Sequence, residues 1–262
     1  MFLLHNKIMQ NILVIRSIVN TIKENGSEEL IQMNYNFRPE LIDLNFDKMS
    51  ISSIETNVFE YCIHLKTLSI EYNKLTSLNN QIFHNDLKNL TELYLGFNKI
   101  QQIDSGCFIM LKNLKILHLN GNLIEKLDDN LFEGLENLIE LNIDNNKIKT
   151  INKDIFSQMT SLEKLSINRN LFKNIETTYF SKLTNIHELY INSNLIESIE
   201  PFSFINLYSL KILDISMNKL KYLPENLFDG LSNLEELYLF KNPIKEIEDG
   251  VFDKMSQLNI CF

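Results

Sequence analysis

The amino-acid sequence predicts an α/β repeat protein: a curved, right-handed solenoid with a parallel β-sheet on its concave face and an irregular or short helical convex face. Two regularities predict it. The pattern L-x-x-L-x-L-x-x-N-x-I recurs nine times with a 24-residue period and one 25-residue step, and a Phe follows every copy in the same register. A fixed period of this length is the signature of a solenoid. The copies begin at Leu41, Leu65, Leu90, Leu114, Leu138, Leu162, Ile186, Leu210 and Leu234.

The first half of each unit predicts a short strand, and the second half predicts the return of the chain. In the unit that begins at Leu114, Leu117 and Leu119 alternate with polar residues, as in a strand with one buried face. The wider spacing of Phe132 and Leu135 favours an irregular or helical return to the next unit. The phenylalanines, which we expect in the core, are Phe59, Phe83, Phe108, Phe132, Phe156, Phe180, Phe204, Phe228 and Phe252.

Position 9 of the unit is Asn in every copy but the first. A single unit cannot bury enough apolar surface to offset the ordering of its chain, so stability must come from stacking on neighbours. A carboxamide both donates and accepts, so it can satisfy backbone groups where the chain leaves the strand. The first unit has Met49 there, as expected for an end unit with no preceding neighbour. The predicted ladder is Asn73, Asn98, Asn122, Asn146, Asn170, Asn194, Asn218 and Asn242.

The complete unit, L-x-x-L-x-L-x-x-N-x-L-x-x-L-x-x-x-x-F-x-x-L, resembles the typical 24-residue class of leucine-rich repeat. That class is found in the ectodomains of Toll-like receptors, Slit, chaoptin and the Nogo receptor. The resemblance covers residues 41 to about 257. It implies a non-catalytic module of a cell-surface receptor, adhesion or secreted protein, located outside the cell, and it leaves the ligand open.

The repeat register predicts three parts: an N-terminal leader or irregular cap at 1–40, nine repeats at 41–257 and a truncated tenth repeat at 258–262. In residues 1–40, polar and charged residues interrupt the apolar runs and no small-residue cleavage site follows, so the secretory signal is a poor one. No run of about 18 apolar residues exists, so we expect no membrane span. The tenth repeat stops inside its strand, which indicates a fragment.

The chain has three cysteines, Cys62, Cys107 and Cys261. Cys62 occupies a position that other units fill with Leu or Met, and Cys261 falls at position 4 of a tenth unit, so we expect both in the core. Extracellular members of the resembling family usually close both ends with disulfide-bonded modules, which three such cysteines cannot form. The lack of cysteines for such modules favours the alternative function, an intracellular scaffold or adaptor in the cytoplasm.

The sequence holds no pattern that predicts catalysis, a cofactor or a metal site. His187-Glu188 begins like a zinc-protease motif, but Ile191 stands where the second His is needed. His118 is expected on the surface with no carboxylate beside it, and Asp128 and Asp129 are expected to be solvated. A net charge of -9 with 25 scattered basic residues also argues against nucleic acid as a partner.

The predicted binding site is the concave face, formed by positions 3, 5, 7 and 8 of successive units. Nine carboxylates there face only Lys48, Lys164, Arg169 and Lys241, so we expect a protein ligand with a basic patch. Exposed aromatic residues are typical of protein contacts. The predicted contact residues are Tyr72, Tyr94, Phe97, Glu71, Glu92, Glu140, Tyr190, Tyr238 and Phe240. Asn25 and Asn89 begin N-x-S/T triplets and are candidate glycosylation sites.

Overall fold

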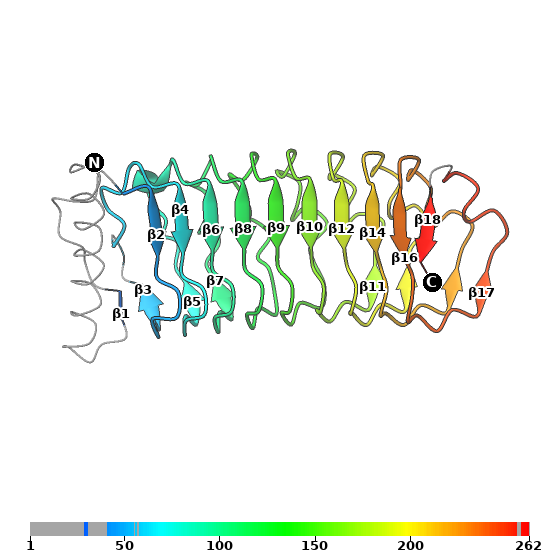
Figure 1. The fold of residues 1–262 in the computed structure, drawn as a ribbon, viewed down its shortest axis with the longest axis horizontal. Coiled ribbons are helices and arrows are strands. Elements are labelled where there is room, and N and C mark those ends of the chain that lie inside the picture. The colour runs from blue at the N-terminus through cyan, green and yellow to red at the C-terminus, as the bar shows by residue number, and fades with distance from the viewer. Residues whose placement is uncertain (1–28, 31–40, 55, 57, 256–257, 262) are drawn as a thin grey trace, which may run out of the picture.

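The computed structural model describes residues 29–30, 41–54, 56, 58–255 and 258–261. They form a curved solenoid whose main sheet has ten parallel strands, one from each turn of the chain (Figure 1). The sheet runs in the order β18-β16-β14-β12-β10-β9-β8-β6-β4-β2. These strands are β2 (Asp43–Asn45), β4 (Thr67–Ser69), β6 (Glu92–Tyr94), β8 (Ile116–His118), β9 (Glu140–Asn142), β10 (Lys164–Ser166), β12 (Glu188–Tyr190), β14 (Ile212–Asp214), β16 (Glu236–Tyr238) and β18 (Asn259–Cys261).

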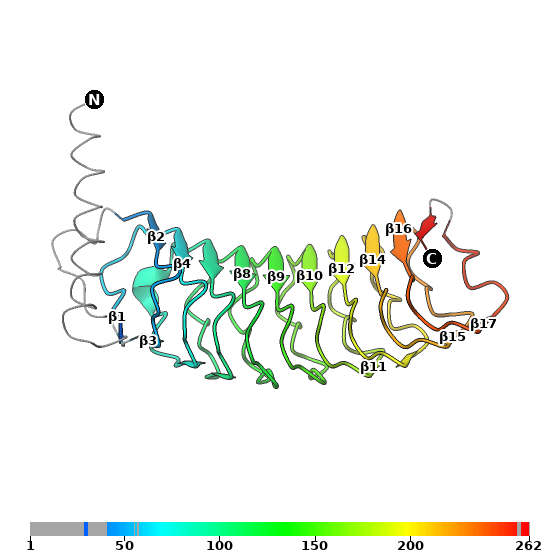
Figure 2. The same ribbon diagram turned by 60° about the horizontal axis from the view of Figure 1, so that its bottom comes forward.

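The return segments on the outer side are irregular, as expected, and carry two-residue strands in place of α-helix. Figure 2 shows the main sheet on the concave side of the arc and the short strands on the opposite side. The helix within the described residues is a single 3-10 turn, η2 (Asn85–Leu87). The short pairs are β1 (Glu29–Leu30) with β3 (Ser53–Ile54), β5 (Ser77–Leu78) with β7 (Gln102–Ile103), β11 (Asn174–Ile175) with β13 (Ser198–Ile199), and β15 (Tyr222–Leu223) with β17 (Glu246–Ile247).

The register of the main sheet stacks equivalent positions on one another. Leu68 pairs with Leu93, and Leu93 with Leu117, and all three side chains are fully buried. The predicted alternation is therefore confirmed. A slip of one residue would turn these leucines toward solvent, so the apolar pattern alone fixes the register.

The predicted phenylalanine positions form a layer inside the solenoid. Eight of the nine rings are at most 1% exposed, and the last, Phe252, is half-buried at the end of the array. Rings of neighbouring units stack, as in Phe132 and Phe156, whose centroids lie 6.3 Å apart. Each ring thus loses its water only because the unit beside it is present.

The asparagine ladder joins each unit to the one before it. Asn146 Oδ1 accepts a hydrogen bond from the backbone N–H of Ile124 at 3.0 Å, and its Nδ2 donates to the carbonyls of Leu119 at 3.0 Å and Ile143 at 3.1 Å. The same contacts recur along the ladder. Met49 lies in the turn after β2, the end strand of the sheet among the described residues, so an Asn there would find no preceding strand to bond.

Two sequence expectations are corrected by the register and the backbone. β18 pairs Ile260 with Leu237 and Cys261 with Tyr238, so Cys261 takes position 5 and not the expected core position 4. Ile260 therefore has the register position of Leu237. Position 8 is also not part of a strand: the residues there have φ between 51° and 68°, as in Tyr72 and Phe97.

Several expectations remain predictions. Residues 1–28 and 31–40, which include Asn25, lie outside the described residues, so the division at 1–40, 41–257 and 258–262 stays a prediction.

Cys62 is fully buried, as predicted from its position, and so is Cys107. The described part of the chain contains no helix with the length and apolarity needed to cross a bilayer.

Two glycines provide a test of how closely the units pack. Gly230 has φ +93, and a Cβ there would lie 2.2 Å from the carbonyl oxygen of Ile205 in the preceding unit. Gly106 also has a left-handed φ of +70, but nothing lies within 4 Å of its Cβ position. We expect Gly106→Ala to lower the free energy of unfolding by about 1 kcal/mol, and Gly230→Ala to lower it by about 1–3 kcal/mol more because the backbones must separate. Urea denaturation measures both, and equal losses would contradict the packing argument.

Candidate functional site

Glutamates recur at position 3 of every second strand on the concave face. Glu92, Glu140, Glu188 and Glu236 open β6, β9, β12 and β16, and all are half-buried. Neighbouring strands are about 4.8 Å apart, so these carboxylates follow one another at roughly 10 Å intervals. The sequence pattern therefore becomes a linear row of negative charge along the solenoid.

Three of these strands also carry a tyrosine two residues later, on the same face of the sheet. The hydroxyl of Tyr94 donates to Glu92 at 2.9 Å and that of Tyr190 to Glu188 at 3.0 Å, and Tyr238 donates to Glu236 in the same way. Burial, together with the adjacent carboxylate, raises the pKa of Tyr94 to about 12. The phenols therefore remain protonated donors and hold the carboxylates in place.

Lys164 occupies the gap between two of the glutamates. Its Nζ lies 3.8 Å from Glu140 Oε1, 3.6 Å from Glu188 Oε2 and 6.0 Å from the ring centroid of Tyr190. The equivalent position 3 of β8 and of β14 holds Ile116 and Ile212, which carry no charge. Two further gaps of the same kind thus lack a bridging lysine.

His118 lies beside a carboxylate, so the expectation that it would have none was wrong. Its Nε2 is 3.2 Å from Glu140 Oε1, and its ring packs edge-on against Tyr94 with centroids 5.0 Å apart. Position 5 of one strand and position 3 of the next are diagonal neighbours, a relation hidden by their 22-residue separation. The described residues contain no group of three or more His, Cys, Asp or Glu side chains that could hold a metal ion. Asp128 and Asp129 are both exposed.

An aromatic stack stands at the N-terminal end of the concave face. The rings of Tyr72 and Phe97 are parallel, 4.5 Å apart between centroids, and 47% and 42% of the two residues is exposed. Lys48 Nζ lies 5.1 Å from the Tyr72 ring, and the Phe97 ring covers Gly121, where a Cβ would approach it to 2.7 Å. Four successive position-8 residues therefore form one continuous row.

The structure groups the predicted contact residues differently from the sequence. Tyr94 packs on His118, apart from the Tyr72–Phe97 stack. At the other end, Tyr238 and Phe240 meet edge-on with centroids 6.4 Å apart, while Tyr190 lies beside Lys164.

The pKa of Glu71, another predicted contact residue, is raised above its ordinary value, first by burial and then by the negative charge of Asp47. The predicted contact residues all remain at least partly accessible.

Asp144 belongs to a structural network on this face. Its carboxylate accepts hydrogen bonds from Ser166 Oγ at 2.8 Å and from the backbone N–H of Asn168 at 2.6 Å. Burial raises the pKa of Asp144 above its ordinary value, although the hydrogen bonds from Ser166 and Asn168 act in the opposite direction. This carboxylate is therefore committed to joining two units.

The raised pKa of Asp144 predicts a pH effect. A carboxyl with a higher pKa in the folded state binds its proton more tightly there, so the associated stability is present below the unfolded pKa and is lost as pH rises through the folded value. Asp144→Asn removes this dependence. We expect the stability of the wild type relative to Asp144→Asn to fall as the pH rises above about 4, the ordinary pKa of an aspartate. Chemical denaturation of both proteins measures the difference, and a constant difference would contradict the assignment.

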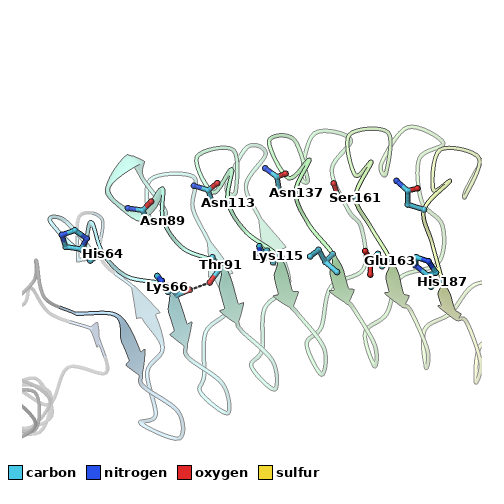
Figure 3. A pocket seen from close by; sticks show the side chains of 12 residues that line it. His64, Lys66, Asn89, Thr91, Asn113, Lys115, Asn137, Ser161, Glu163 and His187 are labelled. Atoms are coloured by element: carbon cyan, nitrogen blue, oxygen red, sulfur yellow. Dashed lines mark hydrogen bonds between the residues drawn. The ribbon is translucent and has the colours of Figure 1, made fainter. Parts of the chain in front are cut away.

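A second surface feature is a groove of 870 Å³ along the edge where the strands begin (Figure 3). It spans six units and has two rows of side chains, one from the loops and one from position 2. The loop row is His64, Asn89, Asn113, Asn137, Ser161 and Asn185, and the strand row is Lys66, Thr91, Lys115, Ile139, Glu163 and His187.

The loop row contains a second asparagine ladder, which sequence analysis missed. Asn89, Asn113 and Asn137 donate through Nδ2 to backbone carbonyls of the preceding unit at 2.6, 2.8 and 2.9 Å. Asn185 and Asn233 do the same. The signal was available, because these residues directly precede the first apolar position of their units.

The repeat pattern and its geometry match a known family. The leucine-rich repeat family model matches residues 63–124, 112–172, 160–220 and 184–244. The chain belongs to the leucine-rich repeat family. No catalytic family is identified, and leucine-rich repeat domains are typically non-catalytic. A comparison with curated proteins finds no match at the level of sequence.

Solved leucine-rich repeat structures superpose on most of the chain. The TLR13–ssRNA13 complex matches with 31% identity and a TM-score of 0.78, over 84% of this chain and 32% of the TLR13 chain. The Leptospira interrogans leucine-rich repeat protein LIC12759 has 25% identity and a TM-score of 0.69, over 86% and 61% of the two chains. The Drosophila Toll–Spatzle complex has 22% identity and a TM-score of 0.73, over 84% and 29%, which shows the shared fold. This chain thus spans about a third of its TLR13 relative.

Proposed function

We propose that this leucine-rich repeat domain is a non-catalytic module that binds a protein ligand on its concave face through basic side chains of that ligand. The observation that supports the proposal most directly is Lys164. A cation of the chain itself lies between Glu140 and Glu188 at 3.8 and 3.6 Å, over the ring of Tyr190. A lysine or arginine of a ligand could bind the same way, with its cation between two carboxylates and over an aromatic ring.

Two neighbouring gaps can accept such a ligand side chain. Glu92 and Glu140 flank Ile116, and Glu188 and Glu236 flank Ile212. A lysine or arginine can lay its aliphatic stem on the isoleucine and place its charge between the carboxylates. The two isoleucines are four strands apart, so the ligand would present basic side chains roughly 19 Å from each other.

The Tyr72–Phe97 stack supports a protein contact at the same face. Flat, exposed aromatic rings with few rotatable bonds lose little entropy on binding and are common among residues that dominate protein interfaces. Both rings are carried on residues with left-handed φ, where Asn or Gly would be less strained. The turn geometry therefore gives no local reason for an aromatic residue at either position.

We also propose that the domain is part of a cell-surface receptor, adhesion or secreted protein. The likeness to TLR13 and to a chain in the octameric complex of Latrophilin 3, Unc5D and FLRT2, at 31% and 26% identity, supports this location. TLR13 is solved with single-stranded RNA and Toll with Spatzle. For this chain the glutamate row favours a protein of the second kind, because it would repel phosphates.

Peptide display tests the proposed binding face. The immobilised protein is used to select from a random peptide library, and we expect the selected peptides to be rich in Lys and Arg. Glu92→Gln with Glu236→Gln keeps an acceptor for each tyrosine and should weaken binding of a selected peptide by about tenfold. The matched control, Glu133→Gln with Glu197→Gln, removes the same charge from exposed positions elsewhere. Unchanged binding by the first variant would reject the proposal.

The alternative of an intracellular scaffold is supported by the positions of Cys62 and Cys107, which are both fully buried core residues of the repeats. A glycosidase distinguishes the two locations. In native full-length protein from the source cells, we expect the enzyme to increase gel mobility through loss of an N-linked glycan, for which Asn25 and Asn89 begin the candidate triplets of this chain. A variant with both Asn25→Gln and Asn89→Gln is the control. Lack of any shift would favour the scaffold.

A further inference from the structure

The edge groove adjoins the proposed concave binding face, and lysines line its N-terminal end. Lys66 and Lys115 line it, both are exposed, and neither makes an ion pair with the residues that the structure describes. They are two units apart, or roughly 10 Å. In a chain of net charge -9, unpaired lysines in a groove form a local site for an anion.

The loops that border this end add further positive charge. Lys88 and Lys112 directly precede Asn89 and Asn113 of the loop row, and both are exposed. They too lack an ion pair within the described ranges. Of the residues that line the groove, only Glu163 is acidic, and it lies towards the other end. The basic character is therefore concentrated over about three units.

The asparagine row provides ordered acceptors beside these lysines. Each Nδ2 of Asn89, Asn113 and Asn137 is held by a backbone carbonyl, which fixes the orientation of the amide. No described donor bonds to their Oδ1 atoms. Fixed, unoccupied amide oxygens at one per unit suit a ligand that repeats hydroxyl groups along its length.

The lining distinguishes between classes of linear anion. Bases of single-stranded nucleic acid need aromatic or Arg side chains to stack on, and peptides are anchored by apolar or aromatic side chains in pockets. Among the residues that line the groove there is one aliphatic side chain, Ile139, and no Phe, Tyr, Trp or Arg. The two imidazoles that could stack on a base, His64 and His187, belong to the first and the last of the six units. The remaining lining side chains are hydroxyl, carboxamide, imidazole and charged groups. Such a surface matches sugar hydroxyls and acid groups.

We propose that the edge groove binds a linear anionic polysaccharide along the solenoid axis. Sulfate or carboxylate groups of the polymer contact Lys66 and Lys115, and its hydroxyls donate to the asparagine oxygens. The groove crosses six units, so an extended chain fits and a compact ligand does not. Lys66 and Lys115 also line a smaller pocket with Glu92 and Glu140, so the groove adjoins the glutamate row. The variants of the lysines and those of the glutamates change different residues, so this proposal and the proposed concave-face function can fail separately.

Direct binding measurements test the proposal, with heparin and hyaluronan as sulfated and carboxylated probes. We expect at least one of them to bind at low salt, with neutral dextran inactive. Lys66→Glu with Lys115→Glu should weaken binding by about tenfold or more. Lys99→Glu with Lys219→Glu is the matched control, since it makes the same change of charge at exposed positions away from the groove and should alter binding by less than about twofold. Thermal melting establishes that all variants are folded.

Three results would overturn this assignment. Absence of binding to both heparin and hyaluronan would remove it, and an equal loss in the two double variants would show only general charge attraction. Tighter binding of polyuridylate or polyglutamate than of either polysaccharide would assign the groove to nucleic acid or to acidic peptide. Binding to only one of the two polysaccharides would show which acid group the lysines recognise, sulfate in heparin or carboxylate in hyaluronan.

Discussion

Phe132→Ala is expected to lower the free energy of unfolding by about 3–5 kcal/mol, because the ring is 1% exposed and its removal leaves a cavity between rigid units. Phe156 stacks on Phe132 and would lose one side of its packing. Since the units are stable only together, the damage should extend to the neighbours on both sides. Urea denaturation measures the loss, and hydrogen exchange locates it along the chain.

Phe252→Ala is the matched control for the phenylalanine layer. Its side chain is chemically identical and stacks on Phe228, but it is half-buried, whereas Phe132 is 1% exposed. We expect a loss clearly below that of Phe132→Ala. Equal losses at both positions would mean that burial by neighbouring units does not determine the stability of the layer.

Asn146→Leu should destabilise the protein by a comparable amount despite its similar size. It leaves the N–H of Ile124 without its acceptor and the carbonyls of Leu119 and Ile143 without this donor. Each buried group left unsatisfied costs about 1–3 kcal/mol. Asn146→Asp should be worse at neutral pH, because a carboxylate only accepts and would face those carbonyls. Thermal and urea unfolding of the two variants give the order.

Met49→Asn tests whether an asparagine at position 9 of the first unit would find hydrogen-bond partners. The ladder donates toward the preceding unit, and β2 is the end strand of the sheet in the part of the chain described. An Asn there should therefore give no gain in stability, whereas a gain of about 1 kcal/mol would show that residues before β2 supply partners. Circular dichroism melts of the single variant are sufficient.

Much of the fold could be predicted because the same pattern of apolar residues recurs in all nine units. Period-two leucines specify the strand, and the spacing of Phe132 from Leu119 specifies the return to the next unit. The tenth strand was misplaced by one residue because it has only one incomplete copy of the pattern, and Cys261 pairs with Tyr238 as a result. Position 8 was grouped with positions 3, 5 and 7 of the strand face, yet every copy bends there through a left-handed φ.

The concave face was predictable as a surface but not in its contacts. Alternation places Tyr94, His118 and Glu140 on one side of the sheet, and only the diagonal relation between strands brings His118 to 3.2 Å from Glu140. Lys164 between two glutamates is equally invisible in sequence, since its partners are 24 residues away on either side. The edge groove was missed because Asn89 was considered only as a glycosylation candidate, and its equivalents in the other units were not compared with it.

The sequence by itself determined the period, the buried residues, the asparagine ladder and membership of the leucine-rich repeat family, because burial and backbone hydrogen bonding impose the same residue type at every turn. The tertiary structure decided which charges neutralise one another and which remain free. Charges on neighbouring units lie 22 to 24 residues apart in sequence, and only the stacking of strands fixes their distances. Binding depends on those distances, so the two candidate surfaces emerged only from the folded solenoid.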